Sequence, residues 1–268
     1  MNPILGDKFR LRFRKDGPLR FLSHLDLTRC VERMLRRANL SFKMTQGFHP
    51  TPRMIFALSM PLGVAGCREV LELELTEQRE AEDVRTRLNV QSPDGLQFDS
   101  SQIVPMKASA VPRRMIYSLQ LPAERIASVQ EIAAQLVQQE KIWVARIKPR
   151  PRKLNIRPYV RGIHVNANDL MLHLDIWVTG SGTARADELI ALLQLQDWLD
   201  AGAILARSEL ELRDEVNANE IPDQPPEGPP ETAPPDAIAF PNHLAADAAG
   251  HDVSTATWGL SPNGPVVE

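Results

Sequence analysis

The order in which strand-like and helix-like hydrophobic patterns follow one another restricts the fold of this chain most strongly. Between residues 8 and 104, apolar residues alternate with polar ones in some segments and recur every three to four residues in others. Alternation is typical of a half-buried strand, and the longer spacing of an amphipathic helix. The expected strands cover residues 8–15, 54–60, 68–75 and 96–104, and the expected helices residues 24–38 and 78–88. This β-α-β-β-α-β order predicts a ferredoxin-like unit over residues 1–106.

A similar order returns in the next hundred residues. The expected strands cover residues 114–121, 142–147, 156–165, 170–178 and 204–212, and the expected helices residues 123–138 and 186–195. Turn-forming residues at 166–169 predict that two of these strands form a hairpin. We therefore expect an α+β fold of two tandem ferredoxin-like (βαββαβ) units packed as one body, with the second unit over residues 107–218.

The composition changes at residue 219. Residues 220–268 contain no Lys or Arg, eight acidic residues and ten of the 22 prolines of the chain. Such a segment cannot bury enough apolar surface to fold. Residues 219–268 are therefore expected to form a disordered, Pro-rich acidic tail.

The expected helix after residue 23 carries a basic face. Ser23 and Asp26 have the spacing of a capping box, which satisfies free backbone N–H groups at a helix start. An apolar stripe runs along one side of the helix, and three arginines lie on the other: Arg29, Arg33 and Arg36. The strand before it presents a second row, with Arg10, Arg12 and Arg14 on the face opposite Phe9, Leu11 and Phe13. We expect the arginines of the helix and of the strand to form one basic surface.

The charge of the chain is divided along the sequence. Residues 1–161 hold 28 Lys and Arg against 16 Asp and Glu, a net charge of +12, and the remainder holds 3 against 18, a net charge of −15. Such asymmetry indicates a polyanionic partner for the basic part, and RNA is the partner we expect. The alternative is that these cations only solvate a helix and two strands.

A loop rich in Pro and Gly follows the basic helix. Pro50 and Pro52 fix the backbone, and Gly47 permits a turn. The loop carries Gln46, His49 and Arg53, which we expect to face a cleft beside the helix start and to bind the ligand.

A further basic stretch at residues 141–161 alternates cations with Trp143 and Tyr159. Basic and aromatic residues together are typical of surfaces that bind nucleic-acid backbones and bases. The candidate contacts here are Lys148, Arg150, Arg152 and Lys153. The alternative is an edge strand that charge and proline protect from aggregation.

Four motifs of this sequence carry a family resemblance. FLSHLDLTR at residues 21–29, Arg36-Arg37-Ala38, QGFHPTPR at residues 46–53 and MIFALSMPLGV at residues 54–64 closely resemble a bacterial radical SAM-linked domain family. The resemblance is strong over residues 8–105, looser to about residue 213 and absent beyond. It implies a domain that works with a radical-SAM protein, here encoded separately.

The residues available for chemistry are few. Cys30 and Cys67 are the only cysteines, and two cannot hold the iron–sulfur cluster of a radical-SAM enzyme. No phosphate-loop, dinucleotide or zinc-hydrolase motif occurs. We expect no cofactor and no metal, and no catalytic activity in this chain.

Three functions remain open at this point. The leading one is a cytoplasmic accessory module that binds tRNA or rRNA and presents it to the radical-SAM partner. A metal-independent RNA-processing enzyme using His24 and His49 is the second, because imidazole titrates near neutral pH. A protein–protein adaptor is the third. No run of residues is long and apolar enough to span a membrane, and no signal peptide is recognised.

Overall fold

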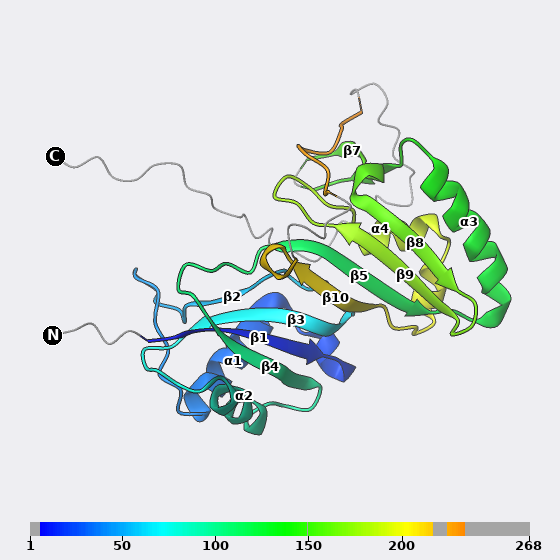
Figure 1. Cartoon of the computed structure of the whole chain (residues 1–268). Coiled ribbons are helices and arrows are strands. Elements are labelled where there is room, and N and C mark those ends of the chain that lie inside the picture. The colour runs from blue at the N-terminus through cyan, green and yellow to red at the C-terminus, as the bar shows by residue number, and fades with distance from the viewer. Residues whose placement is uncertain (1–5, 149, 217–223, 234–268) are drawn as a thin grey trace, which may run out of the picture.

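A computed structural model describes residues 6–148, 150–216 and 224–233. It shows an α+β fold built on one eight-stranded mixed sheet, in the order β4-β1-β3-β10-β5-β9-β8 with β2 paired to β3 (Figure 1). Its strands are β1 (Lys8–Lys15), β2 (Met54–Phe56), β3 (Ala65–Glu74), β4 (Leu96–Val104), β5 (Pro112–Gln120), β8 (Val160–Asn166), β9 (Met171–Trp177) and β10 (Ala206–Leu212). No helix among the described residues is long and apolar enough to cross a membrane.

The first half of the sheet is covered by two helices, α1 (His24–Arg37) and α2 (Ala81–Val90). Ser23 caps α1 by accepting a hydrogen bond from the backbone N–H of Asp26, which confirms the predicted helix start. Asn39 ends the helix with a φ of 51°, and the N–H of Leu40 donates to the carbonyl of Leu35 at 3.1 Å. Asparagine tolerates this left-handed conformation better than most residues. The apolar stripe of α1 packs on β1, β3 and β4 as predicted.

The apolar run at residues 54–60 forms less strand than expected. Only Met54–Phe56 pairs, with residues 71–73 of β3. The start of β3 pairs instead with β10, because Ala206 and Arg207 lie beside Ala65 and Gly66 in a parallel register. One side of β3 is thus shared by β2 and β10.

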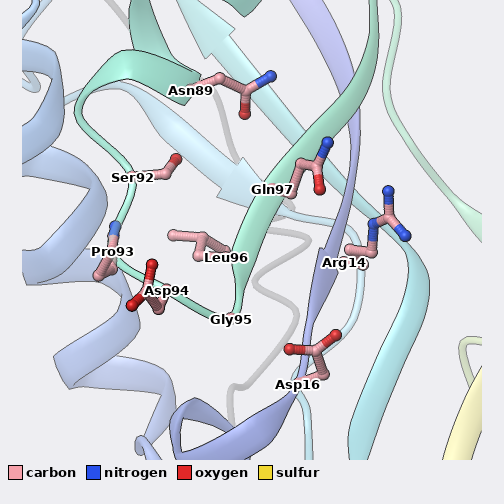
Figure 2. A pocket seen from close by; sticks show the side chains of 9 residues that line it. All are labelled: Arg14, Asp16, Asn89, Ser92, Pro93, Asp94, Gly95, Leu96 and Gln97. Atoms are coloured by element: carbon pink, nitrogen blue, oxygen red, sulfur yellow. The ribbon is translucent and has the colours of Figure 1, made fainter.

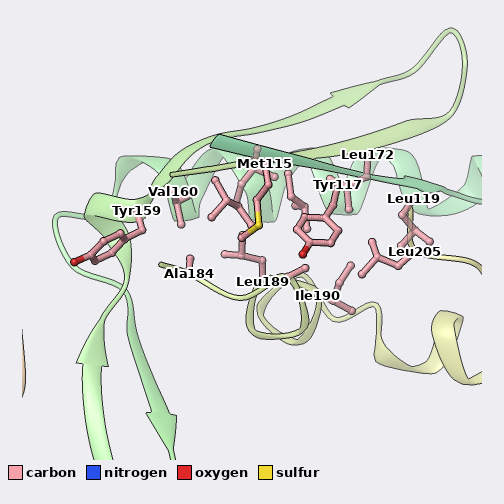
Figure 3. Packing of buried hydrophobic residues seen from close by; sticks show 14 of the residues in the cluster. Met115, Tyr117, Leu119, Tyr159, Val160, Leu172, Ala184, Leu189, Ile190 and Leu205 are labelled. Atoms are coloured by element: carbon pink, nitrogen blue, oxygen red, sulfur yellow. The ribbon is translucent and has the colours of Figure 1, made fainter. Parts of the chain in front are cut away.

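The second half of the sheet is covered by α3 (Ile126–Gln138) and α4 (Ala186–Leu192), which is followed by the short helix α5 (Gln196–Asp200). Leu189 and Ile190 of α4 pack against Met115 and Tyr117 of β5 in the larger hydrophobic core (Figure 3). The predicted hairpin is present, since β8 and β9 pair antiparallel.

The strand predicted at residues 142–147 does not join the large sheet. β6 (Trp143–Arg146) pairs only with β7 (Arg152–Asn155), and together they form a separate two-stranded sheet. The hairpin β6–β7 is therefore an insertion between α3 and β8.

Part of the expected disordered tail is ordered against this hairpin. Asn155 N–H donates to the carbonyl of Glu231 at 2.9 Å, and Ala233 N–H donates to the carbonyl of Lys153 at 2.9 Å. Residues 224–233, which belong to the expected tail, thus have a defined backbone contact with β7. Residues 219–223 and 234–268, the remainder of the predicted tail, lie outside the described residues.

Candidate nucleic-acid interface

The arginine row of β1 is largely buried. Arg10 is 4% exposed and Arg12 is 8% exposed. Arg10 donates to Glu72 Oε1 at 2.9 and 3.0 Å and to the two carboxylate oxygens of Asp214 at 2.7 and 2.9 Å. The prediction of a solvent-exposed row is therefore wrong for these two arginines, and with it the prediction that this row and the α1 stripe form one basic surface.

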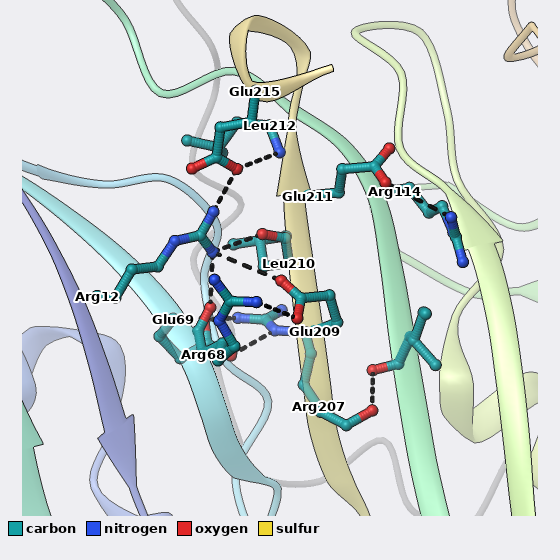
Figure 4. Close-up of polar contacts among 12 residues, drawn as sticks. Arg12, Arg68, Glu69, Arg114, Arg207, Glu209, Leu210, Glu211, Leu212 and Glu215 are labelled. Carbon is teal, nitrogen blue, oxygen red and sulfur yellow. Dashed lines mark hydrogen bonds and ion pairs between the residues drawn. The ribbon is translucent and has the colours of Figure 1, made fainter. Parts of the chain in front are cut away.

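Arg12 reaches across the sheet to the last strand and to the 3-10 turn η4 (Arg213–Glu215) (Figure 4). Its guanidinium donates to the carbonyl oxygens of Leu210 at 2.6 Å and Arg68 at 3.0 Å, and it pairs with Glu215. β10 and η4 thus cover the polar face of β1. The missed signal is the acidic pattern at residues 209–215, whose carboxylates neutralise cations from the opposite end of the sequence.

A fully buried ion pair joins the two halves of the sheet (Figure 4). Arg207 of β10 and Glu69 of β3 are each 1% exposed. Nε of Arg207 lies 2.7 Å from Glu69 Oε1, and Nη2 lies 2.5 Å from Oε2. A third donor, Nη1, meets the carbonyl of Ser59 at 3.1 Å. Two parallel hydrogen bonds join the guanidinium of Arg207 to the carboxylate of Glu69, and this bidentate pair fixes β10 against β3.

Lys15 lies close enough to this pair to interact with both of its charges, and His24 lies near Lys15. Lys15 is 1% exposed, and its Nζ donates to the carbonyls of Leu22 at 3.3 Å and Arg20 at 3.5 Å. Burial lowers the pKa of Lys15. The ring of His24 meets Phe56 edge-on, with 5.3 Å between centroids. Desolvation, and then the charge of Lys15, lower the pKa of His24, which favours its neutral imidazole.

The loop at residues 45–53 projects from the first half of the molecule. It carries Gln46, His49 and Arg53 as exposed side chains, and Nη1 of Arg53 lies 3.4 Å from Glu74 Oε2. His24 makes its ring contact with Phe56 rather than with His49. The described residues contain no group of three or more His, Cys, Asp or Glu that could hold a metal ion.

A polar pocket of about 410 Å³ lies elsewhere, between the end of β1 and the turn from α2 to β4 (Figure 2). It is lined by Arg14, Asp16, Asn89, Ser92, Pro93, Asp94, Gly95, Leu96 and Gln97. Arg14, the exposed member of the β1 row, pairs with Asp99 at 3.0 Å. This pocket is not the cleft expected beside the start of α1, because no residue of the loop at 45–53 lines it.

The arginines of α1 are exposed, as predicted, and differ in their partners. Arg36 pairs with Glu32 at 2.8 Å, and Arg29 lies 3.7 Å from Asp26. Arg33 has no ion pair with any described residue. Within the described part of the chain, the helix therefore presents a free cation between two that neighbouring carboxylates partly neutralise.

The tip of the hairpin β6–β7 presents several exposed cations. Lys148, Arg150 and Arg152 are exposed, and Lys153 is half-buried. None of the four forms an ion pair with a described residue. Figure 1 places β7 and α1 far apart, toward opposite ends of the molecule. The predicted contact residues thus form two separate basic surfaces.

Comparison with known proteins places the sequence in a family. The chain is similar to an unknown protein from Galdieria sulphuraria, with 8% identity, a TM-score of 0.26 and coverage of 77% of this chain and 98% of that one. It is also similar to a putative glycine cleavage system transcriptional repressor, with 12% identity, a TM-score of 0.21 and coverage of 78% and 99%. Both scores are too low to support an argument about the fold. No curated protein matches the sequence. The family described as "Uncharacterized protein conserved in bacteria (DUF2344)" matches residues 8–186, which is about two thirds of the chain, and the chain therefore belongs to that family.

Proposed function

We propose that this protein is an accessory module that binds RNA and presents it to a separate radical-SAM protein. The observation that carries the RNA part is the tip of the hairpin β6–β7, where Lys148, Arg150 and Arg152 are exposed without an ion pair from any described residue. Elsewhere in the basic half, many cations already have carboxylate partners. Free cations on a projecting hairpin are suited to phosphate contacts, which provide most of the non-specific affinity for nucleic acids.

The exposed face of α1 provides a second contact in this proposal. Arg29, Arg33 and Arg36 lie exposed on one side of the helix, where they can follow a phosphate backbone. Arg33 has no ion pair with a described residue, and Arg29 and Arg36 pair only with exposed or half-buried carboxylates of the same helix. Since α1 and the hairpin are far apart, one RNA that touches both must be long or folded. A structured RNA such as tRNA or rRNA meets this requirement.

The proposal of a radical-SAM partner is based on the family resemblance of the motifs at residues 21–29 and 46–64. A chain with two cysteines leaves the cluster and its chemistry to another polypeptide. We also propose that the two halves are tandem ferredoxin-like units. In support, both halves have the same strand order. When the strands of the large sheet are numbered 1 to 4 along the chain within each half, β4-β1-β3-β2 and β10-β5-β9-β8 both read 4-1-3-2. Affinity purification from native cells tests the partner, and a preparation that contains no radical-SAM protein would contradict it.

The test of RNA binding is a salt titration of affinity. The variant K148Q/R150Q/R152Q removes three positive charges from the hairpin tip, and R79Q/R85Q/R87Q removes three from the region of α2, where each arginine has a carboxylate partner. We expect the hairpin variant to bind bulk tRNA more weakly, with a log–log salt slope that is lower by about 0.7–0.9 for each phosphate that the variant no longer neutralises. The α2 variant should bind like the parent. Equal affinities and slopes for all three proteins would exclude the hairpin as the RNA site, and tRNA binding by none of them would exclude RNA binding itself.

A further inference from the structure

Phe48 is presented to solvent by the loop at residues 45–53. Its side chain is fully exposed, at 102% of the reference area. The turn below it is closed by hydrogen bonds, since Thr45 N–H donates to the carbonyl of Thr51 at 2.7 Å and Thr51 N–H donates to Thr45 Oγ1 at 3.0 Å. Pro50 and Pro52 add fixed φ angles. A loop whose backbone is restrained in this way loses little conformational entropy when Phe48 binds a ligand.

The base of this turn is tied to the sheet. Arg53 N–H donates to the carbonyl of Lys43 at 2.7 Å, and Lys43 N–H donates to the carbonyl of Glu74 in β3 at 2.9 Å. Met44 pairs with Pro52 as an isolated bridge. The backbone of the loop that carries Phe48 is therefore anchored to the sheet.

The surroundings of Phe48 favour an anionic ligand. Residues 33–68 contain six Lys and Arg and no Asp or Glu. Gln46 and His49, on either side of the ring, are exposed and can form hydrogen bonds with a ligand. The nearest acid tied to this loop is Glu74, which is buried and lies within 3.6 Å of Lys43 and 3.4 Å of Arg53. An apolar pocket of a protein partner would suit the ring alone, whereas a nucleotide suits both the ring and the cations.

We propose that Phe48 stacks on an unpaired base of RNA, so that the ligand of this protein is RNA with unpaired nucleotides rather than continuous duplex. This inference rests on the RNA-binding function proposed above. In a duplex both faces of a base are covered by its neighbours, and only an unpaired base offers a face to an aromatic ring. Stacking of this kind tolerates any base sequence.

Two RNA probes and three substitutions test the inference. The probes are a 12-nucleotide single strand with a central 2-aminopurine and a blunt 12-base-pair duplex. Phe48→Ala and Phe48→Leu should each weaken binding of the single strand by about tenfold and abolish the quenching of 2-aminopurine. Phe48→Trp should retain both, and duplex affinity should change by less than about twofold in all three. Ile55→Ala, which removes another exposed apolar side chain, is the matched control and should bind like the parent.

The outcomes separate this inference from the function on which it rests. If the hairpin variant K148Q/R150Q/R152Q binds the single strand weakly while every Phe48 variant binds like the parent, stacking is overturned and RNA binding stands. If Phe48→Leu keeps full affinity for the single strand and Phe48→Ala does not, the contact with RNA is apolar rather than stacked, and the inference is likewise overturned. If the parent binds neither probe nor bulk tRNA, both proposals fall. Unchanged melting temperatures of the Phe48 variants, expected for a side chain so fully exposed, confirm that binding alone was altered.

Discussion

At the scale of single residues, the buried amine of Lys15 affects the titration of His24. Replacing Lys15 with Met removes the positive charge that helps to lower the pKa of His24. We expect the pKa of His24 to rise in this variant but to stay below its ordinary value, because desolvation, the larger cause, remains. An NMR titration of the imidazole protons measures the shift, and Lys141→Met, in the other half of the chain, is the control. A pKa of His24 that does not change in Lys15→Met would show that the two groups do not interact.

The same lowered pKa has a consequence for stability. The folded state binds the proton of His24 less tightly than the unfolded state, so the unfolded state binds more protons once the pH falls through the ordinary value of 6.5. His24 therefore contributes a loss of stability that begins near pH 6.5 and is complete below its folded pKa. The midpoint of urea denaturation should fall over this range by more in the parent than in His24→Gln.

At the scale of elements, the segment at residues 224–233 is an added edge for the hairpin β6–β7. Besides its two backbone hydrogen bonds, it brings Glu231 to Lys141 at 2.6 Å and the carbonyl of Gly228 to the hydroxyl of Tyr159 at 3.0 Å. A chain that ends at residue 223 should be less stable than one that ends at residue 233 by roughly 1–2 kcal/mol, because several hydrogen bonds of about 1 kcal/mol each are partly offset by the entropy of ordering the segment. Thermal unfolding of the two chains measures the difference. Equal stabilities would mean that this segment does not hold the hairpin.

Local patterns predicted most elements but not what covers them. The cap at Ser23, the apolar stripe of α1 and the strand β1 depend on neighbours within a few residues, and these predictions are confirmed. The half-buried alternation of β1 is not confirmed, because Arg14 is its only exposed residue. Alternation cannot show whether the polar face of a strand meets water, and the partner of Arg10 is Asp214, which is 204 residues away. Composition likewise could not show that residues 224–233 pair with β7, because backbone hydrogen bonds at a sheet edge require no apolar side chains. For the candidate site, the Pro- and Gly-rich loop sequence predicted that Gln46, His49 and Arg53 are exposed. The distance between the hairpin β6–β7 and α1 could not be predicted, because it depends on the order of the strands in the whole sheet.

At the scale of the whole molecule, two halves meet along β3 and β10 through charged groups. Replacing Arg207 with Met leaves Glu69 buried without its partner, and we expect a loss of about 3–5 kcal/mol in the free energy of unfolding. The double variant Arg207→Met/Glu69→Leu removes both charges and should recover most of that loss. Chemical denaturation of the two single variants and the double variant gives the coupling energy. A single variant that costs less than about 1 kcal/mol would contradict a central role for this pair.

The covering of β1 by β10 also sets an order of events during synthesis. β1 and β3 leave the ribosome first. Residues 206–215 contact the charged face of β1, and they are among the last of the described residues to be made. At roughly 5–20 residues per second, the interval between the end of β4 and the arrival of η4 lasts on the order of 5–20 s. Throughout that interval the uncovered face of the nascent sheet carries Arg10, Arg12 and Glu72, which water hydrates well, instead of an apolar strip that would attract other chains. Because the contact between the two halves is made of ion pairs, the first half can stay soluble until β10 has been synthesised.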